Sequence, residues 1–488
     1  MKPRPGWAGR MALCGLALLS ACGTVGPDYR RPEVEVPAAY KERPGWKLIA
    51  PQDEQDRGPW WAVYRDPVLD ELERQVDVSN QNLKRAEAAF REARAALEAA
   101  RAGLFPTLAA SGSARRSGAR GSAVQPSTVE NNVGLSLGAA WEPDIWGKIR
   151  RTIEGAAANA QASAADLANA RLSAQAALAT DYFELRILDE QKRLLDTAIE
   201  AYAQTLQITQ NQYAAGFIAL ADVITAETQL KTTQAQAINV GVLRAQLEHA
   251  IAVLTGRPPA EFAITPAPLT VGVPDIPAGI PSTLLERNPA IAAAERAVAA
   301  SNAQIGVALS AYYPDITLSA SYGFASAAVG TLLHASNALW SLGAGVTETL
   351  FDAGARHARV AEAQAIYDQS VAAYRQTVLS AFEQVENQLA ALRILAQESV
   401  VRDDATRLAR QAVQLTINEY QAGTVPYTSV VTAQTTELAN EQAALTVRQN
   451  RLVASVALIE ALGGGWNVSQ LPASEQMQAE PRALSQHD

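Results

Sequence analysis

Two very long stretches of this chain contain almost none of the residues that end a helix. Residues 355–422 form a run of 68 residues without Gly or Pro, and residues 148–215 contain no Pro and only Gly155. Because Gly and Pro are the strongest helix breakers, we expect one long helix in each stretch. At about 1.5 Å per residue each helix would be roughly 100 Å long. A helix of that length needs packing partners along its whole length.

The residues within these stretches indicate how the helices would pack. Their apolar positions are mostly Ala, as in residues 156–162, rather than the regular Leu seam of a two-stranded coiled coil. Small residues let helices approach closely on more than one flank. The alternatives are a shaft-like coiled coil and a curved wall of many helices, and the Ala-rich pattern favours the wall.

The second half of the chain repeats the first about 207 residues later. Three short segments and their repeats are residues 105–108 and 313–316, 213–216 and 420–423, and 254–256 and 462–464. The offsets are 208, 207 and 208 residues, so the two copies keep their register. This pattern predicts two equivalent segments of one object rather than two independent domains.

The N-terminus has the pattern of a bacterial export signal with a lipid attachment site. Residues 1–21 hold three basic residues followed by a short apolar run, 11–19, which is too short to span a bilayer. Leu-Ser-Ala-Cys at 19–22 resembles the lipobox of lipoproteins, which implies cleavage before Cys22 and its lipidation. Gly23 fits release to the outer membrane. The alternative is an ordinary secretory signal that happens to contain a cysteine.

Composition excludes several classes of function. Residues 1–21 hold Cys14, three of the 41 basic residues and none of the 50 acidic ones, so their removal would leave a net charge of −12. That charge argues against nucleic acid as a partner. With Cys22 lipidated, no thiol remains for a disulfide, a metal or catalysis. We therefore expect no cofactor and no metal site, only the covalent lipid.

Each copy also holds two runs in which apolar and small or polar residues alternate. No run of about 20 apolar residues follows the signal, so we expect no membrane-spanning helix. Alternation over about ten residues is instead typical of transmembrane β-strands, and Trp141, Tyr322 and Trp340 suit the interfacial aromatic girdles of a barrel. The four runs are residues 107–114, 133–141, 315–322 and 340–347, and the first is the weakest.

Four strands are too few to close a barrel, since even the smallest types need about eight. Open strand edges are not tolerated in lipid because their backbone groups would lack hydrogen-bond partners. The chain would therefore have to borrow strands from copies of itself. The alternative is a small soluble sheet. Loops at 116–130 and 324–339 would join the strands and face the cell exterior.

Four further segments, taken in order, resemble one family. They are residues 26–32 (Gly-Pro-Asp-Tyr-Arg-Arg-Pro), 60–69 (Trp-Trp-Ala-Val-Tyr-Arg-Asp-Pro-Val-Leu), 141–148 and 350–354. Together with the lipobox, they resemble the lipoprotein branch of the TolC family of outer-membrane channels, which serves RND-type multidrug efflux. The likeness covers about residues 22–466.

The resemblance implies a mixed α+β membrane fold and a homotrimer. Three chains would share one twelve-stranded β-barrel, four strands per chain, continued by a long α-helical barrel in the periplasm. An equatorial belt of shorter pieces would surround the helices. The implied function is a passive outer-membrane duct for drugs or other small molecules, working with a periplasmic adaptor and an inner-membrane RND pump.

We expect the following division of the chain. The segments are a signal peptide at 1–21, an anchor and equatorial segment at 22–67, a first repeat at 68–256, a Pro-rich linker at 257–281, a second repeat at 282–466 and a C-terminal tail at 467–488.

The glycines at 216 and 423 mark the far ends of the long helices. Each interrupts a helical run, and Gly accepts the positive φ of a helix C-terminal cap. The resemblance places hairpin tips that meet the adaptor at Tyr213, Gly216, Tyr420 and Gly423. The alternative is that the glycines only form tight turns.

A gate at the inner end remains open to several interpretations. Family members often close this end with rings of charged or bulky residues beyond the second tip, but Ser429 and Thr432 stand there. Asp222 and Glu419 are the candidate substitutes, because three-fold symmetry would gather either into a charged ring. A solvated carboxylate on a helix surface is the alternative for each.

The sequence gives no support for a common enzyme active site. It contains no HExxH or P-loop pattern, its one GxSxG match, residues 134–138, lies inside the predicted strand 133–141, and its four His residues are scattered. We therefore expect no enzymatic activity. The remaining alternatives are a type I protein-secretion duct, a metal-ion efflux duct and a non-conducting structural lipoprotein of the outer membrane.

Overall fold

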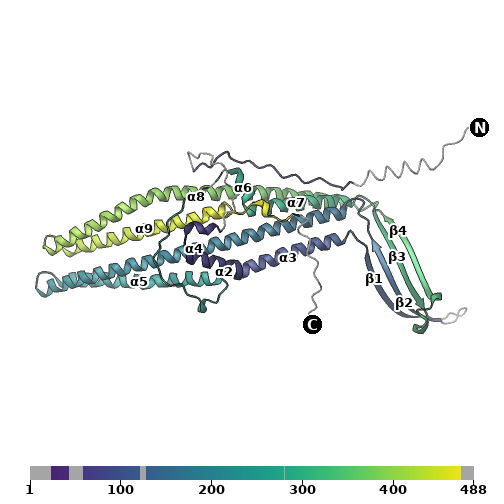
Figure 1. Cartoon of the computed structure of the whole chain (residues 1–488), viewed down its shortest axis with the longest axis horizontal. Coiled ribbons are helices and arrows are strands. Elements are labelled where there is room, and N and C mark those ends of the chain that lie inside the picture. Colours follow the sequence, from purple (N-terminus) through teal and green to yellow (C-terminus); the bar gives the residue numbers. More distant parts are fainter. Residues whose placement is uncertain (1–22, 43–58, 121–127, 278, 280, 474–488) are drawn as a thin grey trace, which may run out of the picture.

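The computed structural model describes residues 23–42, 59–120, 128–277, 279 and 281–473. A four-stranded sheet forms one end of an elongated molecule, and helices run from it to two hairpin tips at the other end (Figure 1). The predicted signal peptide and Cys22 lie outside the described residues.

The two predicted long helices are confirmed. α4 (Lys148–Ala214) and α8 (Ala355–Gln421) each contain 67 residues. Their partners also come in matched pairs. These are α3 (Gln81–Ala102) and α7 (Pro289–Ser310), with 22 residues each, and α5 (Leu220–Leu254) and α9 (Tyr427–Ala461), with 35 each. The equal lengths show that the sequence repeat is a structural repeat.

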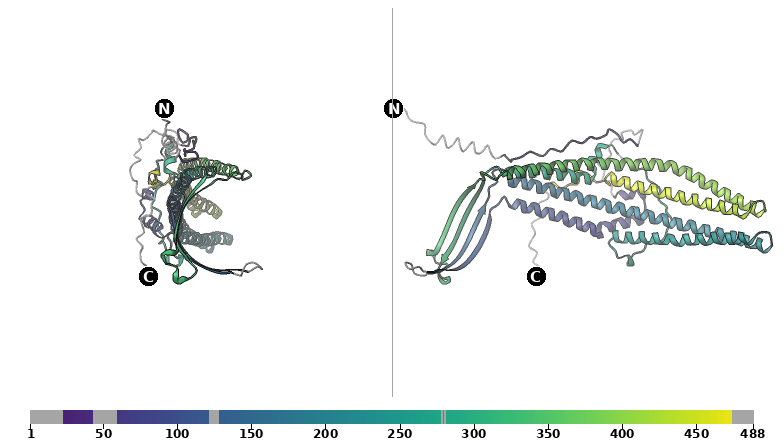
Figure 2. Two further views of the ribbon diagram at one scale, coloured as in Figure 1. Left: turned by 90° about the vertical axis from the view of Figure 1, so that its right-hand side faces the viewer. Right: turned by 180° about the vertical axis from the view of Figure 1, so that it is seen from behind.

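The helices form one curved layer rather than a rope. Near the sheet, α4 packs between α3 and α7, and α7 packs against α8. Further along, α4 packs between α5 and α9, and α9 packs against α8. Each long helix thus spans both halves of the layer while the shorter helices meet end to end beside it. Figure 2 shows the curvature and the open side of the layer.

The sheet is an antiparallel meander in the order β1-β2-β3-β4. Its strands are β1 (Thr107–Ala119), β2 (Thr128–Trp141), β3 (Asp315–Ser326) and β4 (Ala338–Thr347). All four predicted runs are strands. The predicted loop at 116–130 was too long, because β1 continues to Ala119 in register with β2. The loop at 324–339 is shorter too, and it holds two short helices, η3 (Val329–Thr331) and η4 (Ala335–Asn337).

The two faces of the sheet differ in chemistry. The pairs Leu137–Tyr322 and Tyr322–Trp340 place large apolar side chains on one face. On the other face, hydroxyl pairs join neighbouring strands: Ser111 to Ser136 at 2.8 Å and Ser321 to Ser341 at 2.9 Å. The sheet therefore has one apolar face and one face of small and polar residues.

The main core lies midway along the molecule, where short elements cover the helices. These are η1 (Trp60–Tyr64), α2 (Pro67–Ser79), η2 (Pro259–Glu261), α6 (Pro281–Arg287) and η5 (Val468–Gln470). Tyr182 and Phe183 of α4 and Tyr374 of α8 are the largest side chains buried there. This mid-section holds the two halves of the layer together.

One described helix, α5, is long and apolar enough to cross a membrane by length and composition alone. The expectation of no such helix rested on uninterrupted apolar runs, whereas α5 reaches a mean hydropathy of 1.2 with polar residues among its Ala, Val, Ile and Leu. Only 22% of the relevant window is buried, so an apolar flank of α5 is left uncovered by the described residues.

Candidate functional site

The first hairpin tip joins α4 to α5. α4 closes with a Schellman motif, in which the Gly216 N–H donates to the Tyr213 carbonyl and the Phe217 N–H donates to the Gln212 carbonyl, both at 2.9 Å. Gly216 has a φ of +80°, where a residue with a Cβ is strained. Tyr213 is 44% exposed and Phe217 82% exposed. This tip therefore offers aromatic surface to solvent.

The second tip, between α8 and α9, has the same backbone and a different surface. Gly423 has a φ of +76°, and its N–H donates to the Tyr420 carbonyl at 3.0 Å. The Tyr420 side chain, however, is only 5% exposed. Its ring packs on that of Tyr427, with 5.5 Å between centroids. Tyr420 thus faces into its own hairpin, whereas Tyr213 faces out.

Tyr420 and Tyr427 belong to a small core that also includes Ala226 of α5 and Val430 of α9. This core joins the two hairpins behind their tips. Burial is the main cause that raises the pKa of Tyr427 to about 12, and the nearby Tyr420, Tyr202 and Asp222 add to it. Both phenols therefore stay neutral at physiological pH. Packing of the aromatic rings, and not ion pairing of these side chains, holds the two hairpins together behind their tips.

The two candidate gate residues lie at different tips. Asp222 is half-buried in the first turn of α5, and its charge contributes to the raised pKa of both tyrosines. Glu419 is exposed near the end of α8, where its carbonyl accepts the Thr424 N–H at 3.0 Å. The structure does not bring the two carboxylates into contact. Neither forms an ion pair with a residue in the described ranges.

Between the tips and the mid-section, polar side chains form a seam that joins the two hairpins. The Tyr202 hydroxyl of α4 donates to the Gln434 carbonyl of α9, and the Gln434 amide nitrogen donates to the Thr205 hydroxyl, both at 3.2 Å. The Gln434 amide oxygen and both amide atoms of Gln229 are buried without a partner in the described residues. Buried groups without partners cost free energy, so these atoms weaken the seam.

Both the sheet and the helical layer end in unpartnered edges. In the part of the chain that the structure describes, β1 and β4 each pair on one side only. In the half of the layer nearer the tips, the outer helices are α5 and α8. Both carry exposed apolar side chains: Ile224, Ile238, Val242 and Leu243 on α5, and Val400, Val401, Leu408 and Leu415 on α8. Edges of this kind need covering.

The segment that follows Cys22 is fixed at the junction between sheet and helices. The Val25 N–H donates to the Trp146 carbonyl at 3.0 Å, and the buried Arg151 donates to the carbonyls of Val25 and Gly26, both at 3.1 Å. The Trp146 ring stacks on Tyr313 at 4.9 Å. Gly23, the first described residue, therefore lies close to the junction of the sheet and the helices.

The model of the outer membrane efflux protein family matches the chain twice, over residues 72–257 and 280–464. The chain belongs to the outer membrane efflux protein family. It is thus an efflux protein of the outer membrane, and the predicted family is confirmed.

Individual members of this family are similar over almost their whole length. The pyoverdine export outer membrane protein OpmQ of Pseudomonas aeruginosa is 30% identical over 93% of this chain and 98% of its own. SilC of Salmonella typhimurium, a probable outer membrane lipoprotein, is 26% identical over 93% and 98%. The solved structure of the outer-membrane channel OprN superposes with a TM-score of 0.82 at 30% identity, covering 91% of this chain and 100% of that one.

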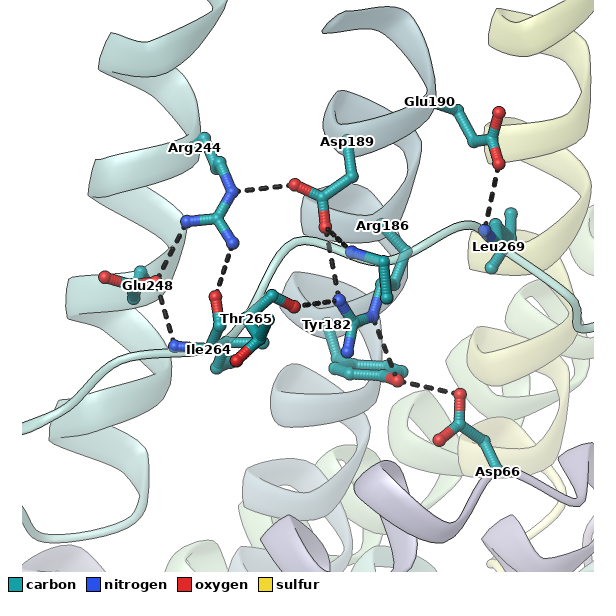
Figure 3. Close-up of polar contacts among 11 residues, drawn as sticks. Asp66, Tyr182, Arg186, Asp189, Glu190, Arg244, Glu248, Ile264, Thr265 and Leu269 are labelled. Atoms are coloured by element: carbon teal, nitrogen blue, oxygen red, sulfur yellow. Dashed lines mark hydrogen bonds and ion pairs between the residues drawn. The ribbon is translucent and has the colours of Figure 1, made fainter. Parts of the chain in front are cut away.

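In this outer membrane efflux protein, residues 264–273 cross the helices as an extended strap. They are part of the segment 257–281, for which the sequence predicts only a Pro-rich linker. Arg244 of α5 donates to the Ile264 carbonyl at 2.6 Å and to Asp189 of α4 at 2.7 Å (Figure 3). Arg186 donates to the Thr265 carbonyl at 2.8 Å and to Asp189 at 3.2 Å. Two guanidinium groups thus share one buried carboxylate and hold the strap.

Carboxylates hold the amide groups of the strap in the same way. Asp189 accepts from the Ala267 N–H at 3.2 Å, Glu190 from the Leu269 N–H at 3.1 Å and Glu248 from the Ile264 N–H at 3.0 Å. Beyond them, Arg448 of α9 donates to the carbonyls of Leu269 and Val271, both at 3.0 Å. The strap is therefore bound to both hairpins, and fixes their separation at the mid-section.

Proposed function

We propose that three copies of this efflux protein form one continuous duct from the periplasm to the cell exterior. The observation that carries the proposal is the pair of open edges. A four-stranded sheet with one apolar face and two unpaired edge strands, β1 and β4, cannot lie alone in lipid. Joining β4 of one copy to β1 of the next removes every edge, and three copies make a twelve-stranded barrel.

Joining the copies in this way would also cover α5 and α8, the outer helices of the layer. Exposed apolar residues on α5 and α8 would meet their counterparts on neighbouring copies. A head-to-tail interface of this kind closes into a ring when the rotation between copies divides a full turn. The helices would then form a tube continuous with the barrel. The proposed lumen needs no catalytic group, only a polar passage and an end that can close.

The lipid anchor fits this arrangement. We propose that Cys22 carries the lipid, because the following residues are bound at the junction of sheet and helices by Arg151 and Trp146. Several acyl chains attached there would enter the membrane beside the barrel, and more than one chain makes a stable anchor. We also propose that residues 257–281, which include the strap, link the first repeat to the second.

The tips would be the docking and opening end. We propose that a periplasmic adaptor of an inner-membrane RND pump contacts the turns at Gly216 and Gly423 and the exposed ring of Tyr213. Tyr420 would act from within, by holding the second turn against α5 through Ala226. Adaptor binding would favour a dilated state of the tips at the expense of a closed one. Asp222 and Glu419 remain the proposed gate residues.

Conductance tests the duct directly. Purified protein incorporated into a planar lipid bilayer should give discrete single-channel steps that its heat-denatured form does not give. Folded, membrane-inserted protein without conductance would favour a structural lipoprotein. Cysteine cross-linking from Tyr213→Cys in intact cells, followed by identification of the captured protein, tests the adaptor separately.

A further inference from the structure

An open groove beside the strap is lined by an excess of cationic side chains. It lies between α4, α8 and α9, has a volume of about 720 Å³ and is bordered by Gly272 and Val273 of the strap. This volume is within the roughly 300–1,000 Å³ typical of ligand sites. Five arginines line the groove: Arg193, Arg407, Arg410, Arg448 and Arg451.

Three of these arginines are paired with acids of the chain. Arg193 contacts Glu190 at 2.5 Å, Arg407 contacts Asp404 at 3.2 Å, and Arg410 contacts Glu441 at 2.5 Å. Their side chains are well exposed, which leaves the groove open to solvent. The Arg407–Asp404 pair is exposed at both residues, and exposed pairs of this kind are weak.

The other two arginines lack a carboxylate partner. Within the described ranges neither Arg448 nor Arg451 forms an ion pair. Arg448 uses one nitrogen for the strap carbonyls, and Arg451 donates only to the Ser399 hydroxyl, at 3.1 Å. The one acid in the groove without an ion pair in this part of the chain is Asp403. The groove therefore keeps a net positive charge in an otherwise acidic protein.

Two buried polar atoms at the groove are also unsatisfied. The Arg451 Nε has no hydrogen-bond partner among the described residues, and neither has the hydroxyl of Thr406, which is only 8% exposed. Thr406 lies on α8 and lines the groove. Buried donors without partners are uncommon and point to a missing acceptor.

We propose that this groove binds an acidic peptide segment through its carboxylates. Guanidinium groups form paired hydrogen bonds with carboxylates. The cations are spread over facing helices, with Arg407 and Arg410 one turn apart on α8 and Arg448 and Arg451 one turn apart on α9. The apolar side chains of Leu194 and Leu445 lie between α4 and α9 along the same groove.

This layout suits an extended chain rather than a single phosphate. A compact phosphate site gathers several donors, often backbone N–H groups, around one point. Here most of the groove is lined by residues in the middle of helices, whose N–H groups are already used within the helices, and only Gly272 and Val273 lie outside a helix. An extended peptide can instead place successive carboxylates against separate arginines. The proposal does not depend on the chain conducting.

Fluorescence anisotropy with labelled hexaglutamate tests the proposal on the full-length protein in detergent. Hexaglutamate should bind and hexaglutamine should not, and added salt should weaken binding. Arg451→Gln should weaken binding about tenfold, the size expected for one charged hydrogen-bonded contact. Arg402→Gln is the matched control, because Arg402 pairs with Glu398 on α8 and does not line the groove. It should change affinity less than twofold.

A variant that is expected to strengthen binding excludes misfolding as the cause of the weaker binding of Arg451→Gln. Asp403→Asn removes the acid without an ion pair and should strengthen hexaglutamate binding several-fold. Equal binding of hexaglutamine, equal effects of Arg451→Gln and Arg402→Gln, or no gain with Asp403→Asn would each overturn the proposal. So would binding of inorganic pyrophosphate without binding of hexaglutamate, which would assign the groove to a small anion.

Discussion

Replacement of Arg244 by Ala should release the strap from the helices without unfolding the protein. Arg244 joins three groups: Asp189 at 2.7 Å, Glu248 at 2.9 Å and the Ile264 carbonyl at 2.6 Å. Asp189 and Arg186 are each only 5% exposed in their side chains. Removing one partner of a buried charge pair costs about 3–5 kcal/mol.

The lower end of that range applies here. Asp189 keeps Arg186 and the Ala267 N–H as partners, and the Arg244 side chain is 19% exposed. We therefore expect local opening of the strap to become easier by about 3 kcal/mol, or roughly 150-fold. The apolar contacts of the mid-section core are unchanged in this variant, so the rest of the protein should stay folded.

Native-state hydrogen exchange measures this opening directly. The backbone amides of Ile264 and Ala267 are protected by Glu248 and Asp189, and should exchange roughly 150-fold faster in Arg244→Ala. Arg402→Ala, which loses only the surface pair with Glu398, should leave both rates within about twofold. Rates in Arg244→Ala that match those of the control would refute the assignment of Arg244 as the main support of the strap.

Three further predictions concern the tips and the mid-section. Asp222→Ala or Glu419→Ala should raise single-channel conductance if either residue forms the gate, and unchanged conductance would reject that residue. Gly423→Ala and Gly216→Ala should each lower stability by only about 1–2 kcal/mol in chemical unfolding, because both have positive φ but nothing lies within 4 Å of an added Cβ; a loss above 4 kcal/mol would contradict this. Burial without a partner raises the pKa of Glu73 to about 9, so the native state binds a proton that the unfolded chain releases near pH 4.5. Stability should therefore fall as pH rises from about 4.5 to 9. Glu73→Gln should flatten this dependence and add on the order of 3 kcal/mol at pH 7, and an unchanged pH profile would exclude a neutral Glu73.

The elements of the fold could be predicted because local rules decide them. A helix of 67 residues follows from the missing Gly and Pro between 355 and 422, and the strands follow from alternation. β1 was underestimated because it has few large apolar residues. Its length is set by pairing with β2 over thirteen residue pairs, which is a tertiary effect.

The candidate site could be predicted only where the backbone alone determines it. Gly216 and Gly423 were found because a helix C-terminal cap needs positive φ. The opposite orientations of Tyr213 and Tyr420 could not be found, because the two segments are alike in sequence and differ in what packs on them. The strap contacts were missed for a similar reason. An Arg inside a helix, such as Arg244, gives no local sign that its partner is a backbone carbonyl twenty residues away.

The central claim is that one chain is an incomplete part of a closed tube. The mass of the intact complex, measured by native mass spectrometry after gentle extraction into detergent, tests it most directly. We predict a single species of three chains, which persists until the sheet itself unfolds. A well-folded monomer that retains its β-sheet content would contradict the account, because β1 and β4 would then be stable without partners.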